Sequence, residues 1–367
     1  MKKILIVTWY YSINFGTALQ AFALQKYLSN EGYFVELLNY FNTKYSWNTI
    51  IKRIVGKLNL IQLIRYYRYR KYSRLRSYIK HEIKEHYVFS NSDLKKIKHD
   101  THAFITGSDQ IWNTYYSYNS FYFLGFVSNV KKIAYASSVG TNSIRQEVKN
   151  EVGKLLNDFN KIGVRENSTV EMLSEVTGRR DIVQVVDPTF LLDNNDWMTF
   201  AKDARFDVKL PKNYICCYFI GNNSEYVQQL KNVSLLTGIK DLVIIPSVEN
   251  PNFEIEDGLY INYAGPKEFV KLLQHAKYIC TDSFHTVALS INFSKDFVVF
   301  KRFKDTEKVS QNSRLYDLLG QYELIYKFYS ESKEWYKSVD YEKVQTILNS
   351  ERNRSKKFLL TAIEENS

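Results

Sequence analysis

The sequence predicts an α/β protein with two Rossmann-like domains that face a cleft. Short, fully apolar segments alternate along the chain with stretches of helical periodicity, as in a parallel sheet covered by helices. This alternation occurs twice, on either side of a polar break at residues 193–196. The 367 residues, of which 45% are hydrophobic, are enough for two domains of ordinary size. We therefore expect domains at residues 1–193 and 194–367, with ligands at the carboxyl ends of the strands.

The chain opens with a predicted strand–helix–strand unit. Residues 2–7 are an apolar strand of the kind found in the middle of a parallel sheet. Residues 17–31 place apolar side chains on one helical face and stop before Gly32, and residues 34–38 form the next strand. The same alternation predicts further strands at 102–106, 132–137, 161–164 and 182–186, and helices at 143–159 and 166–177.

A second alternation follows the polar break. Each of its apolar runs is only a few residues long and is followed by a segment with one apolar helical face. The pattern predicts strands at residues 214–220, 241–245, 278–281 and 296–300, and helices at 224–237, 266–275, 284–293 and 341–364.

Positive charge is concentrated in one part of the first domain. The formal net charge is +11, and residues 44–86 hold twelve Lys and Arg against two Glu. Apolar residues at helical spacing and interleaved tyrosines predict a basic helical insertion at about residues 44–100. Such a surface favours phosphates, whether on nucleic acid, lipid or substrate. Nucleic acid accounts for the charge but not for the polar residues at the predicted strand ends.

The composition also indicates the compartment. No apolar stretch reaches the roughly 18 residues that span a bilayer, and the apolar run after Met1 is too short for a signal peptide. Cys216, Cys217 and Cys280 lie in predicted buried strands, without metal-ligand spacing to a histidine. We expect a cytoplasmic protein with core cysteines and no bound metal.

Residues Asp282 to His285 are the first candidate site. They lie between a predicted strand and a predicted helix, and Ser283 is a good residue to cap that helix. The amides of a first helical turn suit a phosphate or carboxylate, and His285 is placed to face the same ligand as a hydrogen-bond donor or general acid. The alternative is an ordinary capped helix with a half-buried histidine.

Two polar turns of the first domain offer further candidates. Asn14, Gly16 and Thr17 occupy the first strand-to-helix turn, another anion-type position, which lacks the glycine fingerprint of dinucleotide sites. The loop at residues 107–113 is unusually polar for one that follows a buried strand. There Asp109 could act as a base, and Trp112 could stack on a sugar. The alternative for both turns is a well-hydrogen-bonded loop.

Several charged residues end predicted strands or begin predicted helices. Arg165 could clamp an anion bidentately, and Asp187 precedes a proline at the end of the next strand. Arg302 follows a strand, and Arg314 begins a late helix. Each of these positions, taken alone, is more often structural.

Taken together, these stretches resemble the polysaccharide pyruvyltransferase family. The matching pieces are NFGTALQAFALQKYL, GSDQIWN, YASSVG, VREN, VDPTFLL and TDSFH, in the order of the family, from Asn14 to His285. The resemblance implies a fold like that of GT-B glycosyltransferases. It also implies phosphoenolpyruvate as the donor and a pyruvate ketal placed across two hydroxyls of a sugar in a cell-surface polysaccharide or its lipid-linked precursor.

The chain departs from the family at one point of the expected donor site. The family histidine matches His285, but better-known members carry Arg-Leu-His where this chain has Ser283-Phe284-His285. Many relatives also have glycine at the position of Thr286. If the resemblance holds, another arginine has to supply the positive charge that the family arginine would provide at Ser283.

The resemblance and the residue types together give a set of roles. His285 is the expected general acid and Asp109 the expected base, and no step of the reaction demands a metal or another cofactor. The expected donor-binding residues are Asp282, Ser283, Arg165, Arg302 and Arg314. The expected acceptor-binding residues are Asn14, Gly16, Thr17, Gln110, Trp112 and Asn113.

Other functions stay open at this point. A GT-B glycosyltransferase that uses a nucleotide sugar would share the fold. A non-catalytic, membrane-associated binding protein would account for the missing family arginine. A lipid-linked acceptor or a membrane-binding role would bring the basic residues to the anionic inner face of the plasma membrane. Each of them gains roughly 1 kcal/mol of binding free energy there. For a pyruvyltransferase, the expected partners are phosphoenolpyruvate and a glycan or lipid-linked oligosaccharide. The anionic membrane surface is a further candidate partner.

Overall fold

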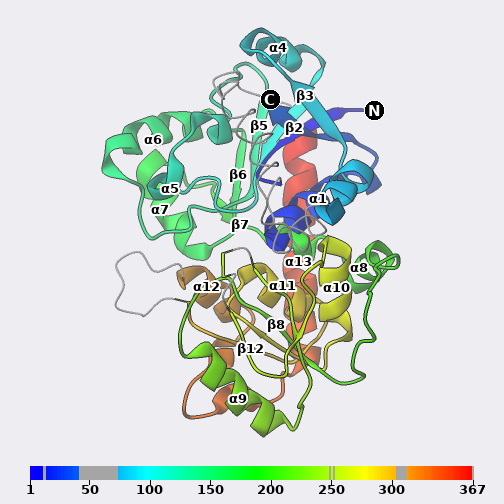
Figure 1. Ribbon diagram of the computed structural model, residues 1–367. Coiled ribbons are helices and arrows are strands. Elements are labelled where there is room, and N and C mark those ends of the chain that lie inside the picture. Colours follow the sequence, from blue (N-terminus) through cyan, green and yellow to red (C-terminus); the bar gives the residue numbers. More distant parts are fainter. Residues whose placement is uncertain (11–13, 41–72, 248, 251–252, 303–311, 366–367) are drawn as a thin grey trace.

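The computed structural model describes residues 1–10, 14–40, 73–247, 249–250, 253–302 and 312–365. Two parallel sheets lie in two lobes, one formed by the first half of the chain and the other by the second (Figure 1). A long helix near the C-terminus runs past both lobes (Figure 1). The α/β class predicted from the sequence is confirmed.

The first sheet has seven strands in the order β3-β2-β1-β4-β5-β6-β7, and every pair of neighbours is parallel. Its middle strands read as continuous apolar runs because helices and loops cover both faces. The strands are β1 (Lys3–Val7), β2 (Phe34–Tyr40), β3 (Glu85–Val88), β4 (Ala103–Thr106), β5 (Lys131–Ser137), β6 (Lys161–Val164) and β7 (Val183–Gln184).

Helix α1 (Phe15–Asn30) is buried on nearly all sides, because it lies between the first sheet and the second domain. The other helices of this half cover the sheet or its loops. They are a helix at residues 73–82, α4 (Asn91–Lys96), α5 (Thr114–Ser117), α6 (Lys149–Asn157) and α7 (Asn167–Thr177), with short 3-10 turns η1 (Ile97–Asp100), η2 (Ser120–Phe123), η3 (Gln146–Val148) and η4 (Pro188–Phe190).

The second sheet has five parallel strands in the order β10-β9-β8-β11-β12. These are β8 (Ile215–Tyr218), β9 (Leu242–Ile244), β10 (Leu259–Tyr260), β11 (Tyr278–Thr281) and β12 (Phe297–Val299). The helices of this half are α8 (Asn194–Phe200), α9 (Tyr226–Thr237), α10 (Pro266–His275), α11 (Phe284–Asn292), α12 (Ser313–Gln321) and α13 (Tyr341–Glu364), with 3-10 turns η5 (Ile325–Lys327) and η6 (Glu334–Tyr336).

Two details of the first half correct the sequence prediction. The segment at 143–159 becomes helical later than expected, with η3 and then α6 beginning at Lys149. The predicted insertion at about 44–100 includes β3, which pairs with β2 at the edge of the sheet. Residues 41–72 of that insertion lie outside the described residues.

The two lobes are joined by one hydrophobic core. A single cluster of buried side chains includes Ile4 and Leu19 of the first half together with Cys216 and Val287 of the second. Each sheet also packs a separate cluster against its other face. A large apolar junction of this kind opposes free movement of one domain against the other.

Helix α13 links the two halves by hydrogen bonds as well as by packing. Arg352, which is buried, donates from Nε to the carbonyl oxygen of Phe190 (2.6 Å) and from Nη2 to Oδ1 of Asn292 (2.9 Å). At the end of the helix, Nζ of Lys131 in β5 donates to the carbonyl oxygen of Ile363 (2.6 Å). Among the described residues, none of the helices has the length and hydropathy that a membrane span requires.

We expect the substitution Arg352→Met to lower the free energy of unfolding by about 2–4 kcal/mol, because it leaves buried acceptors without a charged donor. Arg354→Met is the matched control on the same helix, since Arg354 is half exposed and pairs with Glu351 one turn away. Loss of such a surface pair costs less than about 1 kcal/mol. Urea denaturation measures both values, and equal losses would contradict a linking role for Arg352.

Candidate active site

The carboxyl ends of strands from both sheets meet where the domains touch. Helix α1 begins after β1, helix α11 begins directly after β11, and the two helices contact each other. Asp109 follows β4, Arg165 follows β6 and Asp187 follows β7. The structure therefore gathers predicted residues from both halves of the chain into one region, as expected for ligand sites in open α/β sheets.

His285 packs directly on Gly16, so that the first turns of α11 and α1 touch. A Cβ atom added at Gly16 would lie 2.1 Å from Nδ1 of His285, which leaves room only for glycine. The imidazole is buried, and its Nε2 lies 3.5 Å from a carboxylate oxygen of Asp187. This Nε2 atom makes no hydrogen bond to any described residue. The imidazole is thus fixed between the domains, with Nδ1 against Gly16 and Nε2 facing the carboxylate of Asp187.

The two helix N-termini at this junction are capped differently. Asn14 caps α1, and its Oδ1 accepts a hydrogen bond from the amide of Gly16 (3.0 Å). Ser283 occupies the N-cap position of α11, as predicted, but its side chain makes no capping hydrogen bond. The first-turn amides of α11 are therefore not engaged by their own cap residue.

The sequence identifies Asp187 as a charged residue at a strand end but assigns it no role in the site. Its carboxylate accepts hydrogen bonds from Oγ of Ser108 (3.1 Å), from Nη1 of Arg165 (3.3 Å) and from the amide and hydroxyl of Thr189 (3.0 and 2.8 Å). Burial alone would raise the pKa of Asp187, but the charges of His285 and Arg165 and these hydrogen bonds hold it well below its usual value. Asp187 is therefore a fixed negative charge beneath His285.

Arg165 is a buried arginine with unused hydrogen-bonding capacity. Its side chain is 2% exposed, and Nε donates to Oε1 of Glu166 (2.8 Å). The ring of Phe284 covers the guanidinium, whose central carbon lies 4.0 Å from the ring centroid. Nη2 is buried and has no hydrogen-bond partner within the described part of the chain. A buried donor of this kind costs free energy unless a ligand satisfies it.

Arg314 adds a second buried positive charge near Arg165. Burial, together with the charges of Arg165 and Arg302, lowers the pKa of Arg314 to about 9. Arg314 lies at the start of α12 and shares the lining of one small void with Arg165 and Phe284. Glu166, Asp187 and Asp317 line the same void, so both guanidinium groups lie among carboxylates.

Asp282 and Arg302 are engaged with each other. Nε of Arg302 lies 3.3 Å from Oδ2 of Asp282. The same carboxylate accepts hydrogen bonds from the amides of Ile220 (2.7 Å) and Gly221 (2.6 Å) and from the hydroxyl of Tyr226 (2.8 Å). Asp282 therefore anchors the loop after β8, and its contacts support the position of α11 from below.

Asp109 lies in the loop that follows β4. It accepts a hydrogen bond from Oγ1 of Thr17 (2.5 Å) and one from the amide of Gln110 (2.8 Å). Burial alone would raise the pKa of Asp109, yet the charges of His285 and Arg165 and these hydrogen bonds lower it below its usual value. The carboxylate is therefore ionised at neutral pH and able to accept further hydrogen bonds.

Other residues of the 107–113 loop are held inside the domain. Trp112 is fully buried, stacks on Phe123 and donates from Nε1 to the carbonyl oxygen of Tyr122 (3.0 Å). This corrects the expectation that Trp112 stacks on a sugar, because its ring has no exposed face. Asn113 is also buried, and its Oδ1 accepts hydrogen bonds from two amides of α5.

Cavities of different character adjoin this region. One of about 520 Å³ opens beside the first domain. A void of only about 10 Å³ lies between Arg165, Phe284 and Arg314. The larger cavity is lined by four of the predicted residues, namely Asn14, Thr17, Asp109 and Gln110.

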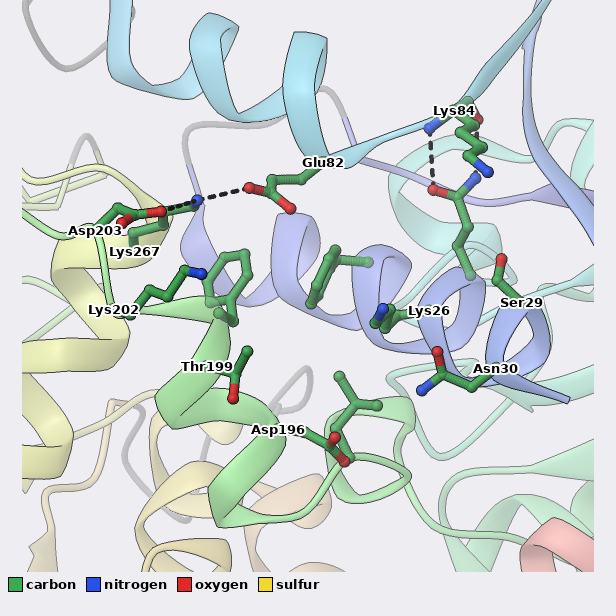
Figure 2. Close-up of a pocket in the computed structure, with 14 residues that line it drawn as sticks. Lys26, Ser29, Asn30, Glu82, Lys84, Asp196, Thr199, Lys202, Asp203 and Lys267 are labelled. Carbon is green, nitrogen blue, oxygen red and sulfur yellow. Dashed lines mark hydrogen bonds and ion pairs between the residues drawn. The ribbon is translucent and has the colours of Figure 1, made fainter.

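A further cavity of about 480 Å³ lies along the other half of α1, where it meets α8 and α10 (Figure 2). Its walls carry both signs of charge. Lys267 pairs with Glu82 (2.6 Å) and lies 3.9 Å from Asp203 (Figure 2). None of the residues predicted for the site lines it. Among the described residues, no group of three or more His, Cys, Asp and Glu side chains is placed to hold a metal ion.

The sequence of this chain matches the profile of one protein family. The family profile described as Polysaccharide pyruvyl transferase matches residues 14–302, which include Asn14, Asp109, Arg165, Asp187 and His285. The chain belongs to the polysaccharide pyruvyl transferase family. Membership indicates a transferase that acts on polysaccharide, and it confirms the resemblance found in the sequence. No curated protein matches the sequence.

Solved structures show the same fold as this family member. UDP-GlcNAc 2-epimerase from Neisseria meningitidis, bound to UDP-GlcNAc, is 10% identical with a TM-score of 0.54, over 98% of this chain and 100% of the epimerase. The S. aureus protein MnaA in complex with UDP is 14% identical with a TM-score of 0.50, over 100% of this chain and 99% of MnaA. At these identities the likeness concerns the fold alone, and it confirms the GT-B-like arrangement of two domains.

The contact between Gly16 and His285 predicts the effect of one methyl group. We expect Gly16→Ala to displace the imidazole and lower the free energy of unfolding by about 1–3 kcal/mol, because the added carbon overlaps the ring. Gly320→Ala in α12 is the matched control, since its Cβ would meet nothing closer than 3.9 Å, and it should be neutral or slightly stabilising. Urea denaturation compares the two, and an unchanged Gly16→Ala protein would contradict the close approach of the helices.

The lowered pKa of Asp187 predicts a dependence of stability on pH. Because its pKa is lower in the folded protein than in the unfolded chain, where it is about 3.9, its contribution is complete above about pH 4. That contribution is lost as the pH falls further. Asp187→Asn should therefore be less stable than the wild type at pH 7, and the difference should shrink below pH 4. Unfolding free energies at pH 7, 5, 4 and 3 test this, and a constant difference would contradict it.

Proposed function

We propose that the protein transfers pyruvate from phosphoenolpyruvate to two hydroxyls of one sugar in a cell-surface polysaccharide or its lipid-linked precursor. The observation that carries this proposal is the buried Arg165, whose Nη2 has no hydrogen-bond partner among the described residues, beside Arg314 and His285. Phosphoenolpyruvate carries a carboxylate and a phosphate, and both anions suit the planar fork of an arginine. Family membership supports a polysaccharide acceptor.

The donor would lie between the arginines and the N-terminus of α11. Arg165 and Arg314 supply positive charge where the family arginine is replaced by Ser283. The first-turn amides of α11, which Ser283 does not cap, supply further donors for one of the anionic groups. The void of about 10 Å³ is too small for this ligand, so the ring of Phe284 has to move off Arg165 when the donor enters.

The reaction balances without an oxidant or a metal. A proton adds to the methylene carbon C3 of phosphoenolpyruvate, and C2 becomes electrophilic. One sugar hydroxyl attacks C2 and loses its proton, the bond from C2 to the phosphate oxygen breaks, and inorganic phosphate leaves. The second hydroxyl then attacks C2, its proton passes to the released phosphate, and the ring closes. The products are a cyclic ketal of pyruvate and inorganic phosphate.

His285 and Asp109 fit the two proton transfers. His285 would protonate C3, since its imidazole lies at the start of α11 and is oriented by Asp187, whose carboxylate is 3.5 Å from Nε2. Asp109 is ionised and keeps free acceptor positions beside the hydroxyl of Thr17, so it could accept the proton of the attacking hydroxyl.

Contact with an anionic membrane surface stays a prediction. Most of the basic residues between 44 and 86 lie outside the described residues, and those that follow, such as Arg74 and Lys84, lie beside the junction of the domains. A lipid-linked acceptor at the inner face of the plasma membrane would give that basic surface a use. We make no proposal of nucleic-acid binding.

Phosphoenolpyruvate at millimolar concentration should raise the melting temperature of the wild type, because it binds only the folded protein. Calorimetry should show that Arg165→Lys binds it at least about tenfold more weakly, since one charged hydrogen bond is worth roughly 1.5–3 kcal/mol. His285→Asn should bind it within about threefold of the wild type, yet release phosphate at least about 100-fold more slowly with an accepted glycan.

Arg354→Lys is the control for these measurements, because Arg354 is half exposed, pairs with Glu351 at the surface and lies outside the site. It should match the wild type in binding and in phosphate release. A melting temperature that rises with UDP-GlcNAc or another nucleotide sugar, and not with phosphoenolpyruvate, would replace the proposal by a nucleotide-sugar glycosyltransferase.

A further inference from the structure

The cavity of about 520 Å³ beside Asp109 has walls of a distinct composition. Its volume falls within the roughly 300–1,000 Å³ of small-molecule sites. Aromatic side chains follow the ends of β1 and β2, and among them are Trp9 and Tyr40. Asp109 lies on one side of the cavity, and Glu249, from the second domain, lies on the other. Both domains therefore contribute to this space.

The described lining of this cavity differs in charge from the void beside Arg165, where arginines and carboxylates occur together. Among the described residues that line it, Asp109 and Glu249 carry negative charge and none carries positive charge. Arg165, Arg302 and Arg314 line none of it. An anionic group placed here would meet two carboxylates and no Lys or Arg among the described lining residues, which is unfavourable in a partly buried site.

The aromatic wall is held in place by hydrogen bonds and ring contacts. Trp9 is half-buried and meets Tyr122 edge to face, with ring centroids 5.9 Å apart. Its backbone carbonyl accepts a hydrogen bond from Nε2 of Gln20 (2.8 Å). The hydroxyl of Tyr10 donates to Oε1 of Glu85 (2.6 Å). These rings therefore form a fixed surface before any ligand binds.

We propose that this cavity binds an uncharged glycosyl unit and rejects sugars that carry a carboxylate or a phosphate. The apolar C–H face of a pyranose would pack on Trp9, and its hydroxyls would donate to the carboxylates of Asp109 and Glu249. Glu249 is then a specificity-determining residue supplied by the second domain. The inference deepens the proposed function and rests on it in one respect, namely that the hydroxyls next to Asp109 are those that react.

The arrangement separates the two substrates by charge. The donor anion is held on the side of Arg165, and the neutral acceptor unit lies on the side of Asp109. Gly16 and Thr17, in the first turn of α1, lie between these regions, because Gly16 touches His285 and Thr17 donates to Asp109. A ketal can form only where the two substrates meet, and this turn is the place where the two regions meet.

Matched pairs of sugars test the inference directly. We would measure binding of methyl glucoside against methyl glucuronide, and of methyl galactoside against methyl galacturonide, by saturation-transfer NMR and calorimetry. Each measurement is made with and without phosphoenolpyruvate. At least one neutral glycoside should bind, at least about tenfold more tightly than its uronide partner, at neutral pH and low ionic strength.

Two variants connect that preference with the cavity. Glu249→Gln should bring the affinities for a neutral glycoside and its uronide at least about threefold closer together, because one repulsive charge is removed. Trp9→Ala should weaken binding of the neutral glycoside at least about tenfold. Glu256→Gln, an exposed carboxylate outside the cavity, is the control and should leave both affinities unchanged.

The outcomes separate this inference from the proposed function. Uronides that bind as tightly as neutral glycosides, or no saccharide binding with or without phosphoenolpyruvate, would overturn the inference. Phosphoenolpyruvate binding that is lost in Arg165→Lys would still support the donor in that case. Neutral glycosides that bind in a Trp9-dependent way, to a protein that ignores phosphoenolpyruvate, would instead leave the cavity assignment standing and remove the proposed donor.

Discussion

The site depends on the direct contact between the backbone at Gly16 and the imidazole of His285. This contact brings the N-termini of α1 and α11 together, although the two helices belong to different sheets. It also sets the distance between His285 and Asp187, which follows β7. A continuous hydrophobic core around α1 holds the two domains in this position. The absence of a single side chain at one residue therefore decides whether the strand ends of both domains can form one site.

Electrostatic asymmetry follows from this junction. Arg165 and Arg314 line the small void together with carboxylates, whereas Asp109 and Glu249 are the only charged residues in the described lining of the larger cavity. Because the region is largely buried, these charges act with little screening by water. If the proposed donor and acceptor are correct, this difference in charge would separate the binding of an anionic donor from that of a neutral sugar.

Much of the fold could be predicted from the sequence. A smaller part of the candidate site could be predicted in the same way. Strand β11 and helix α13 were predicted at their observed bounds, because a doubly buried strand and a long helical period leave strong local patterns. Strand β3 was missed, since an edge strand with Glu85 and His86 has no such pattern. Trp112 was predicted to stack on a sugar but is fully buried, because a sequence does not show which aromatic ring the surrounding loop buries.

Helix α13 has a consequence for the modular use of this protein. It comes last in the chain, but it contacts the second domain near its start and the first sheet near its end. The five-stranded sheet is thus enclosed by two segments that both belong to the junction, η4 before it and α13 after it. An exchange of one domain between relatives therefore needs two crossover points instead of one. A single fusion point near residue 193 would separate α13 from the first sheet, on which the end of this helix packs.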